Sequence, residues 1–210
     1  MDAKLTCSVV FVTFLGEMFI SPVNAENRFN YNYLYADLAA GSFNDDIGTN
    51  SNVTSLSVGG KKLIQEHILA TLDYEARFIH PNNNTTTENY TLLPGGALRY
   101  SIEEGWDLIA GAKLGYVWSS QTNDITDEKV FSDGDFMWGG DVSLKYELDQ
   151  HWQISLTGEM RRSDILDEDI FNIRADYQIF PRMALAGFYN HRNNGKTTVN
   201  EGGISVKYWY

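Results

Sequence analysis

Apolar and polar residues alternate between Trp106 and Trp118, and this alternation is the clearest structural signal in the chain. One set of alternate residues is wholly apolar and ends in tryptophan at both limits, whereas the other contains an acid, a base and glycines. A period of two predicts a β-strand, because successive side chains point to opposite faces. Twelve steps of ~3.3 Å, tilted by ~40°, span roughly 30 Å, which fits a transmembrane β-strand with its aromatic girdles.

Similar alternation recurs over residues 26–210 and predicts one all-β domain of ten strands. A closed antiparallel transmembrane β-barrel is expected, because closure gives every strand two hydrogen-bonded neighbours. Eight strands are the alternative, if the second segment is not a strand and another pair merges. The expected strands are Phe29–Phe43, Val53–Gly60, Ile68–Phe78, Thr91–Ile102, Trp106–Trp118, Phe136–Leu148, Trp152–Arg161, Phe171–Ile179, Met183–His191 and Gly203–Tyr210.

The predicted connections alternate between long and short, as in outer-membrane barrels with long extracellular loops and short periplasmic turns. The long ones are 44–52, 80–90, 119–134, 163–169 and 193–200, and the short ones include 61–66 and 101–105. Pro94 is expected near the start of its strand, where proline is tolerated. The facing of Met183–His191 is ambiguous from the pattern.

The first 25 residues resemble a secretory signal peptide. Lys4 precedes a mostly apolar run, and Val23-Asn24-Ala25 forms a small-residue cleavage site. The only cysteine, Cys7, lies in this segment, so the exported domain has no disulfide. The domain from residue 26 carries a net charge of −11 and no basic cluster that would indicate nucleic-acid binding. The mean hydropathy of −0.31 excludes a helical membrane protein but fits a barrel.

The signal segment, the aromatic opening strand from Phe29 and the closing strand together resemble the small outer-membrane barrels of Gram-negative bacteria, broadly the OmpA/OmpX type. The resemblance implies an integral outer-membrane location, with lipid and lipopolysaccharide as surroundings. It also implies that the barrel-assembly machinery reads the closing-strand pattern of Ile204, Val206, Tyr208 and Tyr210. Two features depart from this family: its members usually have eight strands, and their last residue is usually phenylalanine.

If the apolar faces meet lipid, the opposite faces fill the lumen with nearly balanced charge. Small barrels are filled by their own side chains, and buried charges must be paired, so a side-chain-filled lumen with an ion-pair network is expected. The expected acids are Asp37, Asp73, Glu75, Asp107, Asp141, Glu147, Glu159 and Asp176; the expected bases are Arg77, Arg99, Lys113, Lys145, Arg161, Arg174 and Lys207.

A soluble lipocalin-like barrel is the structural alternative, because a period of two does not by itself say which face points inward. The mixed charges of the polar face and the aromatic ends of the apolar faces favour the membrane barrel. The aromatic residues expected to form interfacial girdles are Trp106, Trp118, Trp138, Trp152, Tyr208 and Tyr210.

No motif for catalysis, a cofactor or a metal stands out. Of the four histidines, only His191 is expected near the outer rim, where Asp169 or Glu201 could orient it, but no serine pattern accompanies it. The acidic loops contain Asp45, Asp46, Asp124, Asp127, Glu128, Asp133, Asp164, Asp167, Glu168 and Asp169. They are interpreted as a solvated rim, because their spacing matches no calcium-binding loop.

The sequence therefore predicts a non-enzymatic outer-membrane barrel with a role in envelope structure or surface contact, such as adhesion through the acidic loops. The first alternative is a narrow, porin-like channel for small solutes, which requires the lumen charges to line a path. The second is a lipid- or peptide-modifying enzyme centred on His191.

Overall fold

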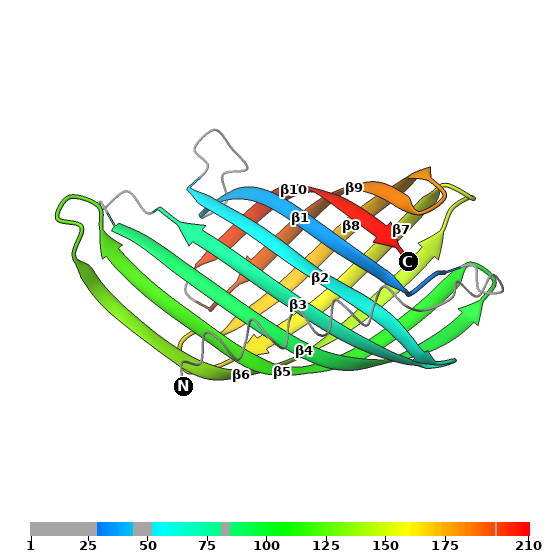
Figure 1. The fold of residues 1–210 in the computed structure, drawn as a ribbon, viewed down its shortest axis with the longest axis horizontal. Coiled ribbons are helices and arrows are strands. Elements are labelled where there is room, and N and C mark those ends of the chain that lie inside the picture. Colours follow the sequence, from blue (N-terminus) through cyan, green and yellow to red (C-terminus); the bar gives the residue numbers. More distant parts are fainter. Residues whose placement is uncertain (1–28, 44–51, 81–84, 196) are drawn as a thin grey trace.

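The computed structural model describes residues 29–43, 52–80, 85–195 and 197–210, and in these residues ten strands form one closed antiparallel barrel (Figure 1). The prediction of ten strands is confirmed. Each strand pairs with its neighbour in sequence, and β1 pairs with β10 to close the barrel. The strands are β1 (Tyr33–Phe43), β2 (Val53–Gln65), β3 (Ile68–Ile79), β4 (Thr85–Glu103), β5 (Trp106–Asn123), β6 (Lys129–Glu147), β7 (Trp152–Arg162), β8 (Glu168–Phe180), β9 (Met183–Asn193) and β10 (Thr198–Trp209).

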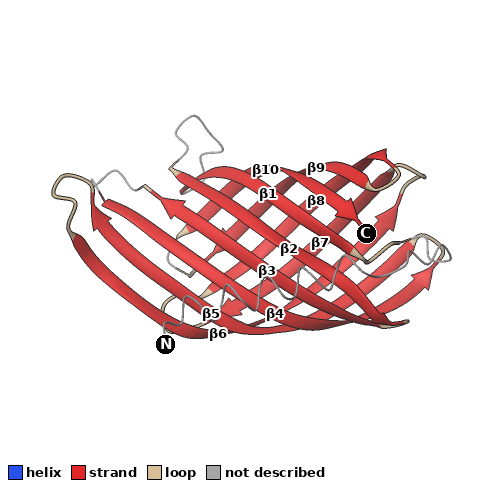
Figure 2. Cartoon of the chain, in the orientation of Figure 1, coloured by secondary structure: helices blue, strands red, loops and turns tan. Residues whose placement is uncertain are grey.

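Several strands continue into segments that the sequence analysis assigned to loops. The expected long loop 119–134 is wrong, because β5 and β6 pair as far as Thr122↔Lys129 and only residues 124–128 lie between the two strands. The expected turn 61–66 is also wrong, since β2 runs to Gln65. Beyond the expected membrane span both strand faces contain polar residues, so the regular alternation that marks a strand is lost there. Figure 2 shows that the described residues consist almost wholly of strands and short connections.

The middle of β4 contains an irregularity at Pro94, a residue that was expected near the start of its strand. Pro94 is the tenth residue of the 19-residue strand, and the pairing of β4 with β5 skips Leu93 and Pro94. Proline has no backbone N–H to donate to a neighbouring strand, which explains the interruption. The backbones approach closely here: a Cβ on Gly115 would lie 1.9 Å from the carbonyl oxygen of Leu92. Glycine at 115 allows this approach.

The two faces of the barrel wall differ as the alternation predicts. Outward side chains such as Leu98, Leu114 and Ile204 are 63%, 59% and 68% exposed, whereas inward residues such as Ile109 are fully buried. The ambiguous strand β9 follows the same rule, because Ala184, Ala186, Asn190 and Arg192 are its buried residues. The outward belt of large apolar side chains matches a lipid-facing surface.

The predicted signal peptide, residues 1–25, lies outside the described residues, as does the loop segment with Asp45 and Asp46. Among the residues that are described, no helix has the length and hydrophobicity to cross a membrane.

Candidate functional site

The barrel interior collects the charged residues of all the strands and is the candidate functional site. Among the predicted lumen charges, Glu147 has one buried carboxylate oxygen. The other predicted lumen charges lie inside the barrel wall: Asp37, Asp73, Glu75, Arg77, Arg99, Asp107, Lys113, Asp141, Lys145, Glu159, Arg161, Arg174, Asp176 and Lys207.

The most buried group of charges is the outer ion-pair layer, defined as Glu75, Arg77, Arg161, Glu168, Arg192 and Glu201. All six residues are less than 9% exposed. Each arginine contacts more than one carboxylate. Arg192 Nε lies 2.9 Å from Glu201, and its terminal nitrogens contact Glu75 and Glu168. Arg77 contacts Glu168 at 2.6 Å and Glu201 at 3.0 Å. This layer crosses the barrel, because it joins strands β3, β7, β8, β9 and β10.

Three members of this layer, Glu168, Arg192 and Glu201, are absent from the lumen charges predicted from the sequence, and that prediction is corrected here. Glu168 was assigned to an acidic loop and Glu201 to the outer rim, and Arg192 was not considered. All three lie beyond the predicted strand ends but keep the parity of their strands: Arg192 is two residues after the buried Asn190, and Glu201 is four before the buried Ser205. Extending the alternation past the predicted ends would have found them.

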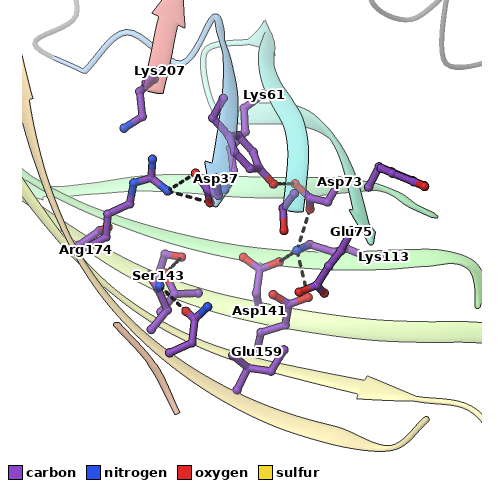
Figure 3. A pocket seen from close by; sticks show the side chains of 18 of the residues that line it. Asp37, Lys61, Asp73, Glu75, Lys113, Asp141, Ser143, Glu159, Arg174 and Lys207 are labelled. Atoms are coloured by element: carbon purple, nitrogen blue, oxygen red, sulfur yellow. Dashed lines mark hydrogen bonds and ion pairs between the residues drawn. The ribbon is translucent and has the colours of Figure 1, made fainter. Parts of the chain in front are cut away.

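Below this layer lies a middle cluster around one lysine. Lys113 Nζ contacts Asp73 at 2.9 Å, Glu159 at 3.2 Å and Asp141 at 3.6 Å (Figure 3). Asp73 also accepts a hydrogen bond of 2.6 Å from the Tyr35 hydroxyl. These side chains line a cavity of about 180 Å³ inside the barrel.

The same cavity extends to an inner cluster nearer the end where the chain terminates. Arg174 contacts Asp37 at 3.1 Å and Asp176 at 3.2 Å, and Lys207 contacts Asp176 at 2.7 Å. Lys145 also lines the cavity, and the partners found for it among the described residues are aromatic: its Nζ lies 4.9 Å and 5.3 Å from the ring centres of Tyr31 and Tyr33.

Aromatic and aliphatic side chains fill the lumen at the end that carries both described chain ends. This terminal apolar cluster consists of Phe29, Tyr31, Tyr33, Leu69, Ala97, Ile109, Ala184 and Trp209. Phe29 and Tyr31 precede β1 and lie inside the barrel, so the expected strand from Phe29 begins four residues too early. The Tyr31 hydroxyl donates to Asp107 at 2.6 Å, and Asp107 also accepts from Arg99 at 2.6 Å.

At the opposite end, the β7–β8 connection folds over the barrel mouth. Ile165 and Leu166 pack against the outer apolar cluster of Leu93, Val117 and Met137. Beside them is a second cavity of about 210 Å³, which reaches Arg77 and Glu168 of the outer ion-pair layer. The interior therefore consists of ion-pair clusters between two apolar groups, one at each end.

The predicted girdle residues lie on the outside of the barrel with one exception. Trp138, Trp152 and Tyr208 are 47%, 40% and 36% exposed, and Trp106 stacks on Tyr146 with ring centres 4.3 Å apart. Trp118 is half-buried beside Tyr116 on the outer face.

The exception is Tyr210, for which the predicted place in the outer aromatic girdle is wrong. It is only 5% exposed, and its hydroxyl donates to the Lys61 carbonyl. Strand β10 ends at Trp209, and the Tyr210 amide donates to Asn32, which turns the last residue away from lipid. Tyr210 therefore does not share the outward face of Ile204, Val206 and Tyr208.

The arrangement proposed around His191 is absent from the described residues. The His191 ring is hydrogen-bonded to Asn200 at 2.8 Å on the outer face, Asp169 pairs with Arg162, and Glu201 points into the lumen. The described residues also contain no group of three or more histidine, cysteine or acidic residues arranged to hold a metal ion.

A closed antiparallel barrel with an apolar exterior and a charged, filled interior defines the chain as an outer-membrane type of β-barrel. The chain belongs to the outer membrane protein beta-barrel domain family, whose model matches residues 11–208. It is therefore an integral outer-membrane protein, as the sequence resemblance implied, and the lipocalin-like alternative is excluded. No curated protein matches the chain.

Several solved structures are similar to the chain at low identity. The translocator domain of the autotransporter NalP from Neisseria meningitidis has a TM-score of 0.51 at 10% identity, with 99% of this chain and 98% of that one covered. The β domain of the Bordetella autotransporter BrkA has a TM-score of 0.50 at 11% identity, covering 85% and 99%. Neisserial surface protein A has a TM-score of 0.45 at 13% identity, covering 85% and 96%.

Proposed function

We propose that the protein is a non-conducting, non-enzymatic barrel that acts at the cell surface by binding an extended polypeptide through a sheet that projects beyond the barrel rim. The observation that carries this proposal is the unequal length of the strands. Strands β4, β5 and β6 have 19, 18 and 19 residues, whereas β7 and β9 have 11. The β5–β6 hairpin accordingly reaches furthest to the left in Figure 1.

The projecting sheet has one unpaired edge. Pairing between β6 and β7 begins at Trp138↔Arg162, so residues 129–137 of β6 pair with β5 alone. Unpaired backbone N–H and C=O groups on a strand edge can accept a further strand from another chain. Exposed apolar side chains lie along this edge and in the adjoining turn: Ile125, Val130 and Phe131 are 74%, 61% and 45% exposed.

The charge around the edge favours a basic partner. Asp124, Asp127, Glu128, Asp133 and Asp135 all belong to the projecting part of the β5–β6 hairpin, which contains one lysine, Lys129. Such an edge disfavours pairing with a second copy of itself, since like charges would face each other, and it favours an extended segment with alternating apolar and basic residues.

The filled interior supports the non-conducting part of the proposal. Ions would have to pass two apolar clusters and a buried layer in which each arginine is held by at least two carboxylates. The refolded barrel is expected to show no steady conductance in a planar bilayer. Steady conductance altered by Arg99→Ala or Glu159→Ala would instead support the porin-like alternative.

Binding can be tested with two synthetic peptides, one alternating valine and lysine and one alternating valine and glutamate. The barrel is expected to bind only the lysine peptide, and the amide protons of residues 129–137 are expected to exchange more slowly in the complex. Replacing Ile125, Val130 and Phe131 by serine is expected to weaken binding at least tenfold, while Thr126→Ser serves as the control in the same hairpin. Equal binding of both peptides, or no change in exchange at this edge, would contradict the proposal.

A further inference from the structure

The central lumen cavity contains more cationic groups than its carboxylates can pair. Seven cationic side chains and six carboxylates line it. All six carboxylates contact lysine or arginine within 4 Å, and these partners are Lys113, Arg161, Arg174, Arg192 and Lys207. Lys61 and Lys145 also line the cavity, but neither has a carboxylate of the described residues within 4 Å.

These two lysines lie at the same end of the cavity, around one aromatic ring. Tyr33 is the cross-strand partner of Lys61, and its ring centre lies 5.3 Å from Lys145 Nζ and 5.0 Å from Lys207 Nζ. Figure 3 shows Lys61 and Lys207 at this end of the pocket, on the side away from Glu159. Lys207 shares its one carboxylate, Asp176, with Arg174. Two ammonium groups therefore lie over the Tyr33 ring, and the lysine on the neighbouring strand lines the same end of the cavity. Among the described residues, Asp176 is the only carboxylate within 4 Å of any of the three lysines, and it is shared with Arg174.

A partly buried ammonium group without a counter-charge is costly, and a cation–aromatic contact offsets only part of that cost. Hydroxyl groups lie beside Lys145, because Ser155 is its cross-strand partner and Ser143, whose hydroxyl is hydrogen-bonded to Thr157 at 2.7 Å, lies two residues before it on the same lumen face; both serines line the cavity. Lysine binds oxyanions as a point charge with three donors, and serine hydroxyls complete the hydrogen bonding. This combination of donors is suited to an oxyanion.

We propose that the lumen holds one small, free oxyanion of the phosphate type, bound between Lys61, Lys145 and Lys207 beside Tyr33. The cavity of about 180 Å³ lies inside the barrel wall and between the two apolar end clusters. A soluble ion is the expected occupant, because a lipid headgroup would have to bring its acyl chains through one of these clusters. The ion has a structural role here: it supplies the negative charge that the lining residues lack.

The test uses inorganic phosphate as the probe and the refolded barrel in a neutral, phosphate-free sugar detergent. The protein is refolded in sodium phosphate or in sodium chloride of equal ionic strength, so that the ion can enter before the lumen closes. Phosphate is expected to raise the Tm by at least ~2 °C, because a ligand that binds only the folded state stabilises it. Phosphorus-31 NMR is expected to show one phosphate per barrel that remains after dialysis.

Lys145→Met keeps the length of the side chain and removes its charge. This variant is expected to retain no phosphate and to have the same Tm in both salts, whereas Lys129→Met, in the exposed hairpin, should respond like the wild type. Lys61→Met provides the same comparison if Lys145→Met does not fold. An equal Tm of the wild type in both salts, or an undiminished phosphate response in both lumen variants, would overturn the proposal. Peptide binding at the projecting sheet is a separate measurement, so the two proposals can fail independently.

Discussion

Substituting Arg192 by methionine tests directly whether the barrel interior is filled or hydrated. Arg192 contacts three carboxylates of the outer ion-pair layer and is 5% exposed. Removing one member of a buried ion pair costs ~3–5 kcal/mol, because the remaining charge stays buried without its partner. Each abandoned carboxylate keeps one arginine: Glu75 keeps Arg161 at 2.5 Å, and Glu168 and Glu201 keep Arg77. We therefore expect a loss near the lower limit, ~3 kcal/mol.

The matched control is Arg162→Met, one residue beyond Arg161 at the rim. Arg162 contacts Asp167 and Asp169, whose side chains are 67% and 65% exposed. Exposed ion pairs contribute ~0–1 kcal/mol, so this variant should unfold almost like the wild type.

The assay is reversible urea unfolding in phospholipid vesicles, followed by tryptophan fluorescence. Adding Glu201→Gln to Arg192→Met should cost less than the sum of the two single changes, with a coupling of ~0.5–3 kcal/mol, because the double variant leaves fewer unpaired charges. If Arg192→Met loses no more stability than Arg162→Met, water screens the outer ion-pair layer and the lumen is an aqueous path.

Two further predictions concern the barrel wall and one turn. Gly115→Ala is expected to reduce folding yield strongly, because its Cβ would lie 1.9 Å from a backbone oxygen, whereas Gly158→Ala, with nothing within 4 Å, should fold normally; equal gel mobility shifts of the two on heating would contradict this. In the β6–β7 turn, the amide N–H groups of His151 and then Trp152 hold the pKa of Asp149 below its usual value. Its contribution to stability is therefore present at neutral pH and is lost as the pH falls below the ordinary carboxyl pKa of ~4 and through the lowered pKa of the folded state, so acid should destabilise the wild type more than Asp149→Asn in urea titrations. Equal acid sensitivity of the wild type and Asp149→Asn would contradict this prediction.

The parity of each strand was predictable from the sequence, because lipid on one side and a charged lumen on the other impose a period of two over the membrane span. The inward assignment of Lys113, Asp141 and Arg174 followed from this alone. The strand ends were not predictable by the same means. Beyond the membrane, β5 and β6 have polar residues on both faces, so the pattern no longer distinguishes a paired strand from a loop.

Contacts across the lumen were beyond the reach of a periodicity argument. Arg161 and Glu75 are 86 residues apart, and Arg174 and Asp37 are 137 apart. Which inward residues meet depends on the stagger of ten strands around the barrel, and that stagger is set by the registers of all ten pairs together. Tyr31 shows a second limit. Its alternation with Phe29 and Tyr33 suggested a strand, but Phe29 and Tyr31 pack inside the lumen ahead of β1.

The order of layers within the lumen predicts which of them blocks ions. Ile165 and Leu166 cover the mouth but are only partly buried, and below them lies the fully buried outer ion-pair layer. Replacing both residues by serine should therefore leave the barrel non-conducting in a planar bilayer. Adding Glu75→Ser and Arg192→Ser removes a carboxylate and its contacting guanidinium together and joins the outer and central cavities. Brief conductance events are expected once Phe29→Ser and Tyr31→Ser also open the apolar cluster at the other end. Conductance in the serine pair at 165 and 166 alone would show that the apolar cover, and not the charge layer, is the barrier.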